Sequence, residues 1–391
     1  MTSDLPAHLT GDLAARLDAL LAPVDAGASR ASARPLDREP VHVAYVPADA
    51  FGERTVTDWG EAALAALDQF GSPESLGVDE DVLARVRAKL SRDPIEDLRV
   101  DFEDGYGDQG EAAEDAHAEA AGTALRAGRP TWSGVRVKGF APVTRRRALR
   151  TLELLLGALG EVPEGFVVTI PKVTAPEHVR AADELCQAVD EAFGGSGLRF
   201  EVQVETPAAV ARMAELAALA GDRCAGLHYG TYDYSAALGV AASEQSLEHP
   251  VADHAKAVMQ LHAATRGLRV VDGSSNVLPV GSGDDVRAAW ALHQRLVDRS
   301  LRQGLYAGWD LHPAQLVSRY VAVFAFYRRG FDQAAARLHA YRAQLGGGVL
   351  DEPATVRALA GFLVRGLDCG GLDAGEVSAA TGLTRDELVA L

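Results

Sequence analysis

The sequence predicts a (β/α)8 barrel with an N-terminal helical extension and a C-terminal helical tail or lid. Between residues 41 and 345, eight short and continuously apolar segments alternate with helical patterns. Such runs are typical of parallel strands buried on both faces, and eight strand–helix pairs close a barrel of this kind. No GxGxxG turn follows the first segment, and an open doubly wound sheet usually stops near about six strands, so the barrel is favoured.

The composition describes an acidic chain with a large core. It has 391 residues, of which 48% are hydrophobic, enough for one large domain with a smaller appendage. The formal net charge of −17 argues against non-specific binding to nucleic acid or to an anionic membrane. No segment approaches the roughly 18 apolar residues of a membrane span, and the three cysteines lie far apart. We therefore expect a cytoplasmic protein without disulfides.

Three parts are predicted along the chain. Residues 1–40 form the N-terminal extension, with one amphipathic helix over 9–21, and residues 346–391 form the C-terminal lid or tail. The barrel occupies residues 41–345, and the polar stretch 71–96 interrupts it as an insertion.

The first four strand–helix pairs are marked by prolines and by periodic apolar residues. Pro40 and Pro47 bracket the first strand, because proline cannot donate a hydrogen bond inside a sheet. In the helix over 176–193, Val179 and Val189 fall on one face at helical spacing, which predicts that this face is buried. The predicted strands are 41–46, 97–102, 133–137 and 166–170, and the helices are 59–70, 82–90, 111–127, 145–159 and 176–193.

The last four pairs complete the barrel, and two tail helices follow. A strand over 200–204 runs into a helix opened by Pro207, which suits the first helical turn because its missing N–H has no partner there. The other predicted strands are 224–228, 268–271 and 305–308, and the helices are 284–303, 353–367 and 374–391.

Charged residues follow the carboxyl ends of the predicted strands, where (β/α)8 barrels carry their chemistry. Glu205 and Asp233 follow successive strands, so we expect their carboxylates to converge on one divalent cation. Oxygen ligands with few histidines favour Mg²⁺ or Mn²⁺ over Zn²⁺. The other members of this acidic ring are Asp101, Glu103, Asp104, Arg136, Lys138, Lys172, Asp272, Asp310 and His312.

Several of these residues have a second interpretation that the sequence leaves open. A charge at a strand end is often simply solvated. Lys172 either forms a Schiff base when it is desolvated or pairs with the acidic ring. His228 is either a metal ligand or a packed residue of its strand, and His312 either joins the ring or caps the next helix. Gln203 shares the side of its strand with Glu205 and is expected to line the site.

Short motifs recur at the strand ends in a fixed order. They are Tyr45-Val46-Pro47, Asp101-Phe102-Glu103-Asp104, Val135-Arg136-Val137, Pro171-Lys172-Val173, Val204-Glu205-Thr206, Gly230-Thr231-Tyr232-Asp233, Asp272-Gly273 and His312-Pro313. Together they resemble the citrate lyase beta-subunit-like branch of the HpcH/HpaI aldolase superfamily, over roughly residues 41–320. The segment 348–353 also resembles the C-terminal Gly-x-x-x-Asp-x-Pro segment of that family.

That resemblance implies a metal site on particular residues. Glu205 and Asp233 would hold Mg²⁺ or Mn²⁺, while Glu103 and Asp104 would hold metal-bound water and face the substrate. Arg136 would be a catalytic residue that binds the substrate carboxylate or oxo group. Lys172 is expected to contribute to substrate binding beside it.

The resemblance also implies a mobile lid and an assembly. Asp351 would be a catalytic acid or base that the C-terminal lid carries, often onto a neighbouring subunit, in a homo-oligomer such as a trimer or hexamer. The alternative is that Asp351 only caps the helix that starts at Pro353.

The implied activity is that of a divalent-metal-dependent carbon–carbon lyase or aldolase. It would act on a small 2-oxo or hydroxy acid through a metal-stabilised enolate. Where the family has a Pro-Gly-Asn/Ser turn that helps to seat coenzyme A, this chain has Pro47-Ala48-Asp49-Ala50, so a CoA thioester substrate stays open. The alternatives are a malate-synthase-like condensation of an acyl-CoA with glyoxylate, phosphoenolpyruvate chemistry, or a catalytically silent metabolite-binding barrel.

Overall fold

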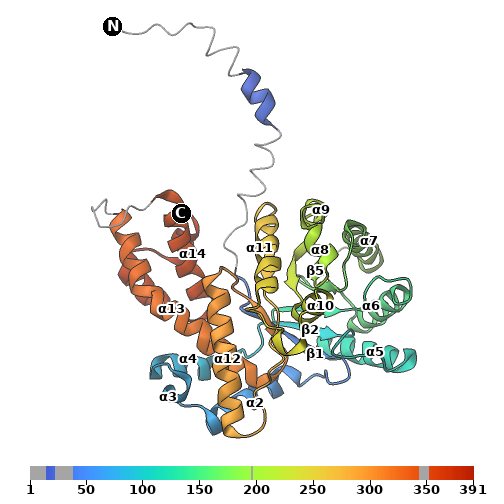
Figure 1. Cartoon of the computed structure of the whole chain (residues 1–391), viewed down its shortest axis with the longest axis horizontal. Coiled ribbons are helices and arrows are strands. Elements are labelled where there is room, and N and C mark those ends of the chain that lie inside the picture. The colour runs from blue at the N-terminus through green and yellow to red at the C-terminus, as the bar shows by residue number, and fades with distance from the viewer. Residues whose placement is uncertain (1–14, 23–37, 195–196, 343–351) are drawn as a thin grey trace.

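The computed structural model describes residues 15–22, 38–194, 197–342 and 352–391. Its parallel strands form one eight-stranded sheet in the order β7-β6-β5-β4-β3-β2-β1-β8. β1 pairs with β8, and two backbone hydrogen bonds join the end of β7 to β8, from Asp272 to Ala307 at 2.8 Å and from Trp309 to Gly273 at 3.2 Å. The sheet therefore curls into a barrel, which confirms the predicted (β/α)8 fold (Figure 1).

The strands are short, and their side chains alternate between the barrel interior and the surrounding helices. Val43, Tyr45, Val271 and Trp309 form a separate buried cluster inside the barrel. The strands are β1 (His42–Pro47), β2 (Asp97–Asp101), β3 (Trp132–Arg136), β4 (Val167–Ile170), β5 (Arg199–Val204), β6 (Cys224–Tyr229), β7 (Arg269–Val271) and β8 (Gly308–Asp310).

Helices surround the barrel and continue as a C-terminal group beside it. In Figure 1, α13 and α14 lie together at the left, away from α5 to α9. The helices are α2 (Thr55–Phe70), α3 (Pro73–Leu76), α4 (Glu80–Arg92), α5 (Glu111–Ala127), α6 (Arg145–Leu159), α7 (Pro176–Phe193), α8 (Pro207–Ala211), α9 (Met213–Leu219), α10 (Thr231–Ala237), α11 (Pro250–Ala264), α12 (Gly283–Arg302), α13 (Pro313–Arg342), α14 (Pro353–Cys369), α15 (Ala374–Thr381) and α16 (Arg385–Val389).

Two predicted elements differ from the structure, and one helix was not predicted. The eighth strand was expected over 305–308, but β8 begins at Gly308, because the backbone pairing with β1 starts there. The tail helix expected over 374–391 is two helices, since Gly382 adopts a left-handed conformation that ends α15. α11 was not predicted from the sequence.

The segment 71–96 contains α3 and α4, and α4 includes the helix predicted over 82–90. Asp79 caps α4 by accepting a hydrogen bond from the Val82 amide at 2.9 Å, and α4 buries Val82, Val86 and Leu90. This apolar face packs against α2 and α13. The segment therefore connects the barrel to the C-terminal helices, while its status as an insertion stays a prediction.

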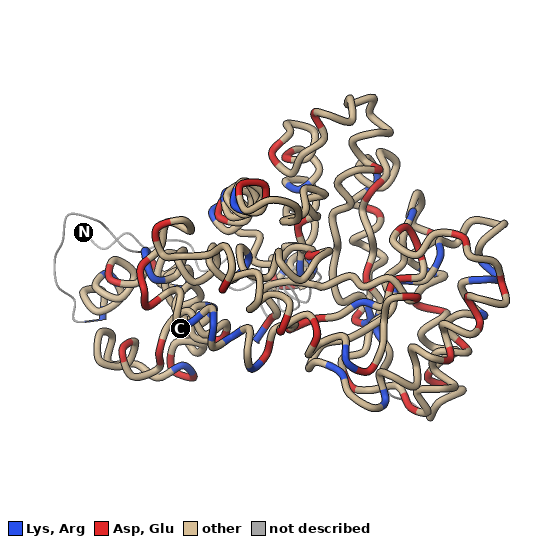
Figure 2. Tube along the Cα trace, turned by 90° about the horizontal axis from the view of Figure 1, so that it is seen from below, with Lys and Arg blue, Asp and Glu red and all other residues tan. Residues whose placement is uncertain are grey.

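The described part of the N-terminal extension is helical over residues 15–22, and its side chains are exposed. Acidic and basic residues are interspersed along the whole described trace (Figure 2). Among the described helices, none is long and apolar enough to cross a membrane. The three cysteines are free and buried.

Candidate metal centre

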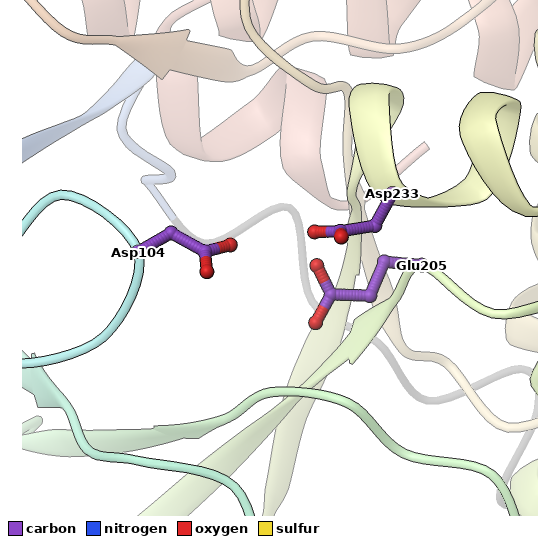
Figure 3. A group of neighbouring side chains, drawn as sticks. All are labelled: Asp104, Glu205 and Asp233. Atoms are coloured by element: carbon purple, nitrogen blue, oxygen red, sulfur yellow. The ribbon is translucent and has the colours of Figure 1, made fainter. Parts of the chain in front are cut away.

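Three carboxylates converge at the carboxyl end of the barrel. Asp104 lies on the loop after β2, Glu205 directly follows β5, and Asp233 lies in the first turn of α10. One oxygen from each lies within 4.8 Å of the others. Figure 3 shows Asp104 pointing across an opening toward Glu205 and Asp233. Glu205 is buried, whereas Asp104 and Asp233 are exposed, so solvent reaches the group from the side of the two aspartates.

The parallel pairing of β5 with β6 brings Glu205 and Asp233 together. The Gly230 amide continues that ladder by donating to the Val204 carbonyl at 2.9 Å. A Cβ on Gly230 would lie 2.5 Å from the Glu205 Cβ and 2.8 Å from its Oε2. A glycine is therefore required here, because any side chain would displace the Glu205 carboxylate.

The Lys172 ammonium occupies the space between these carboxylates. Its Nζ lies 2.6 Å from Asp233, 2.9 Å from Asp104, 3.4 Å from Glu103 and 3.6 Å from Glu205. Its backbone N–H also donates to Glu205 Oε1 at 2.7 Å. Of the two sequence-based interpretations, the structure places Lys172 in an ion pair with the acidic ring. A cation thus fits the centre of the group.

The backbone of Lys172 is itself unusual. Its φ is +54°, the only positive φ among the non-glycine residues that the structure describes. A left-handed conformation at a residue with a long side chain costs about 1–3 kcal/mol and is found preferentially at functional sites. The conformation directs both the amide and the ammonium of Lys172 at the same carboxylates.

Burial raises the pKa values of the two most buried carboxyl groups beside Lys172, Glu205 and Glu103. Burial raises the pKa of Glu205 to about 8, and Glu103 and Asp233 add to this against the opposing effect of Lys172. Burial also raises the pKa of Glu103 to about 7. For Asp104 burial acts in the same direction, but the hydrogen bond and charge of Lys172, together with the charge of Arg136, outweigh it and lower the pKa. One ammonium does not fully compensate this concentration of negative charge.

Arg136 lies beside the group, but its planar fork is already engaged. Nε and Nη2 each donate to Asp101 at 2.6 Å. Nη1 donates to Gln203 at 3.2 Å and lies 3.3 Å from Glu103. The guanidinium also stands over the Tyr45 ring, 5.0 Å from its centroid. A substrate could therefore form hydrogen bonds only with the N–H groups of Arg136 that Asp101, Gln203 and Glu103 do not occupy.

Two expected members of the acidic ring are placed elsewhere. Val271 and Trp309 face the barrel interior, so the next residues, Asp272 and Asp310, face outward. Asp272 pairs with Lys256 at 3.2 Å, and the Asp310 carboxylate lies 3.0 Å from both His42 and Arg319. Both aspartates are buried in structural ion pairs.

Three further candidate residues also have defined positions in the structure. Lys138 pairs with Glu114 at 3.0 Å, away from the carboxylate group. His228 lies inside the barrel, where its Nδ1 is 3.2 Å from the Trp309 Nε1, and His312 accepts from the Ala314 amide at 3.2 Å at the start of α13. Asp351 lies outside the described residues.

A charged layer inside the barrel was not predicted from the sequence. Arg99 on β2 bonds Asp97 and Glu201, and His228 Nε2 lies 3.1 Å from Glu201. The signal was present, because Asp97, Arg99 and Asp101 occupy alternate positions of one strand. Residues at a period of two share a face, so these three had to point into the barrel together.

Comparisons with known proteins agree with this architecture. No curated protein matches the chain. Structures of CitE from Mycobacterium tuberculosis are similar to it. The complex with magnesium, acetoacetate and coenzyme A is 18% identical with a TM-score of 0.52, over 84% of this chain and 98% of that chain. The complex with magnesium and pyruvate is 17% identical with a TM-score of 0.50, over 85% and 100%.

RipC from Yersinia pestis is also similar, at 16% identity and a TM-score of 0.47, over 74% of this chain and 96% of that chain. At such identities the two CitE complexes show a shared fold, which is the fold that the motif resemblance implied. One family matches nearly the full length of the sequence, over residues 25–391. The chain therefore belongs to the family described as "Domain of unknown function (DUF6986)".

Proposed function

We propose that this protein is a Mg²⁺-dependent carbon–carbon lyase that acts on a small 2-oxo or hydroxy acid. The observation that carries the proposal is the convergence of Asp104, Glu205 and Asp233 around a cation position at the carboxyl end of the barrel. The fold likeness to CitE structures complexed with magnesium and with pyruvate or acetoacetate supports it.

The donor set fits a hard divalent cation. All three groups offer carboxylate oxygen, the ligand type that Mg²⁺ and Mn²⁺ prefer. Asp104, Glu205 and Asp233 would hold the ion, with Glu103 oriented toward it from the same loop as Asp104. The ion would act as a Lewis acid for the enolate that carbon–carbon cleavage produces.

The chain's own residues would bind and orient the acid. The Lys172 ammonium lies between the acidic groups, and it would pair with a substrate carboxylate once a metal takes its place there. Arg136 would offer its remaining N–H groups, with its guanidinium held in place by Asp101 and Tyr45. Asp351 stays the proposed acid or base, supplied from the segment before α14, and a homo-oligomer is part of the same proposal.

Ligand-dependent stabilisation and product formation test this function. Thermal unfolding of the full chain is measured with Mg²⁺ or Mn²⁺, each alone and with pyruvate, oxaloacetate, glyoxylate or acetyl-CoA. In a separate assay, carbon–carbon cleavage of hydroxy acids is monitored by measuring the oxo acid that is released. We expect stabilisation to be largest with metal and oxo acid together.

Two variants separate a site effect from a general one. Asp233→Asn should remove the metal-dependent stabilisation, whereas Glu153→Gln changes an exposed carboxylate on α6 and should not. A wild-type chain that gains no stability from metal, with or without the acids, would exclude the proposed lyase. Stabilisation by acetyl-CoA with glyoxylate only would instead favour the condensation alternative.

A further inference from the structure

A cavity lies at the end of the barrel opposite the carboxylate group. Its volume is about 440 Å³, within the range of sites that bind small organic molecules. Val41, Leu268 and Tyr306 line it just before the strands β1, β7 and β8, and Val364 and Arg365 line it from α14. The carboxylate group sits beyond the other ends of the strands, so this cavity is a separate site.

Arg365 brings an incompletely paired positive charge to this cavity. Its guanidinium stacks on the Tyr306 ring, with 4.2 Å between its carbon and the ring centroid. Its one hydrogen bond to a described residue runs from Nη1 to the Gly361 carbonyl at 3.1 Å. Asp368, one turn later on the same helix, is instead bound by Arg385 at 2.6 and 2.8 Å. Arg365 has no carboxylate partner within the described residues.

Arg269 adds a second positive charge to the same wall. Its nearest carboxylate oxygen is 3.6 Å away on Asp97, which Arg99 already binds. The Arg269 Nη2 donates to the Pro40 carbonyl at 3.0 Å. Burial lowers the pKa of Arg269, which indicates that its charge is poorly compensated. Glu39 also lines the cavity, and it is not free of partners.

We propose that this cavity binds a small organic anion, a carboxylate or a phosphate monoester with an apolar portion. The Tyr306 ring holds the plane of the Arg365 guanidinium, so its free N–H groups are oriented for two-point binding of the anion. Leu268 and Val364 offer contacts to the apolar portion. A ligand here would join α14 to the barrel. This site does not depend on the proposed lyase activity.

Titration calorimetry on the full chain tests the proposal with benzoate and phenyl phosphate as probes and neutral benzyl alcohol as reference. We expect saturable binding of at least one anion and none of the alcohol. Which probe binds distinguishes a carboxylate ligand from a phosphate ligand. Binding should be unchanged by Mg²⁺ with pyruvate, because those ligands address the other end of the barrel.

Matched arginine variants locate the binding site. Arg365→Met keeps the apolar stem and should weaken anion binding at least about tenfold, the effect of losing a charged hydrogen bond. Arg357→Met is the control, since Arg357 is exposed on the same helix and does not line the cavity. Circular dichroism checks that both variants fold.

A third variant fills the cavity instead of removing its charge. Ala264 lines the cavity and is exposed, so Ala264→Trp should be tolerated and should block binding even if Arg365→Met fails to fold. The proposal is overturned if no anion binds saturably, if Arg365→Met or Ala264→Trp binds like the wild type, or if Mg²⁺ with pyruvate displaces the probe.

Discussion

Glu201 on β5 and Glu205 directly after that strand lie four residues apart and have opposite electrostatic environments. Burial disfavours ionisation of Glu201, but Arg99 and His228 hold its pKa well below the ordinary value. Glu201 also accepts from Thr169 at 2.9 Å. Burial raises the pKa of Glu205 to about 8, because one shared ammonium does not compensate its charge. The inner glutamate is a structural ion, and the outer one is available for an added cation.

The largest expected effect is on stability, from the inner glutamate. Glu201→Gln leaves Arg99 buried without one of its carboxylate partners, and breaking such a pair costs about 3–5 kcal/mol. Urea denaturation of metal-free protein measures it. Glu205→Gln is the matched control and should not lower the free energy of unfolding, because it removes a poorly compensated buried carboxyl rather than one partner of a compensated pair. Equal losses in both variants would remove the distinction.

The outer glutamate should dominate metal binding. Glu205→Gln should weaken Mg²⁺ binding about a hundredfold or more, since even a lost outer partner of a ligand costs about ten- to a hundredfold. Isothermal titration with Mg²⁺ measures this without reference to activity. If Glu205→Gln binds Mg²⁺ with wild-type affinity, the ion is held elsewhere.

Lys172 should behave as an internal substitute for the metal. Lys172→Met leaves the carboxylates without their cation, so the metal-free chain should lose about 1 kcal/mol of stability, a modest effect because the ammonium is partly exposed. Mg²⁺ should then stabilise this variant more than it stabilises the wild type. The thermal shift of each protein with and without Mg²⁺ decides, and an equal or smaller shift in the variant would contradict substitution.

The smallest expected effect is on pH dependence. A carboxyl whose folded pKa is raised contributes stability below its unfolded pKa near 4.5 and loses it as pH rises through the folded value of about 8. The metal-free chain should therefore lose about 1 kcal/mol between pH 7 and pH 9. Glu205→Gln should lack this loss, as chemical denaturation at both pH values will test. An identical slope in the variant would assign the titration to another group.

Strand periodicity and strand order were enough to predict much of this fold and part of its candidate site. The eight-strand alternation predicted the barrel, and the positions of Glu205 and Asp233 after neighbouring strands predicted their approach. The pairing partners were not predictable, because they come from elements distant in sequence. Asp272 was expected in the site because it follows a strand. In the structure it pairs with Lys256 on α11, a helix that was not predicted from the sequence.

Local backbone conformation and side-chain pairing also limited what could be predicted about the site from the sequence. The left-handed backbone of Lys172 is stabilised by tertiary contacts rather than by its residue type, so the sequence favoured no such conformation. Arg136 ends β3 beside the carboxylate group, but the Asp101 carboxylate that occupies its fork comes from the adjacent strand. Its availability to a substrate therefore depended on a pairing that only the folded chain shows.

The junction between β7 and β8 bears on how the barrel moves. Backbone hydrogen bonds from Asp272 and Trp309 cross this junction, whereas β5 and β6 are aligned over most of their length. In native-state hydrogen exchange, a short junction of this kind opens before longer ladders do. The carboxylate group comes from β2, β5 and β6 and the segments that follow them. Transient opening of the barrel at this junction would therefore leave those carboxylates in register.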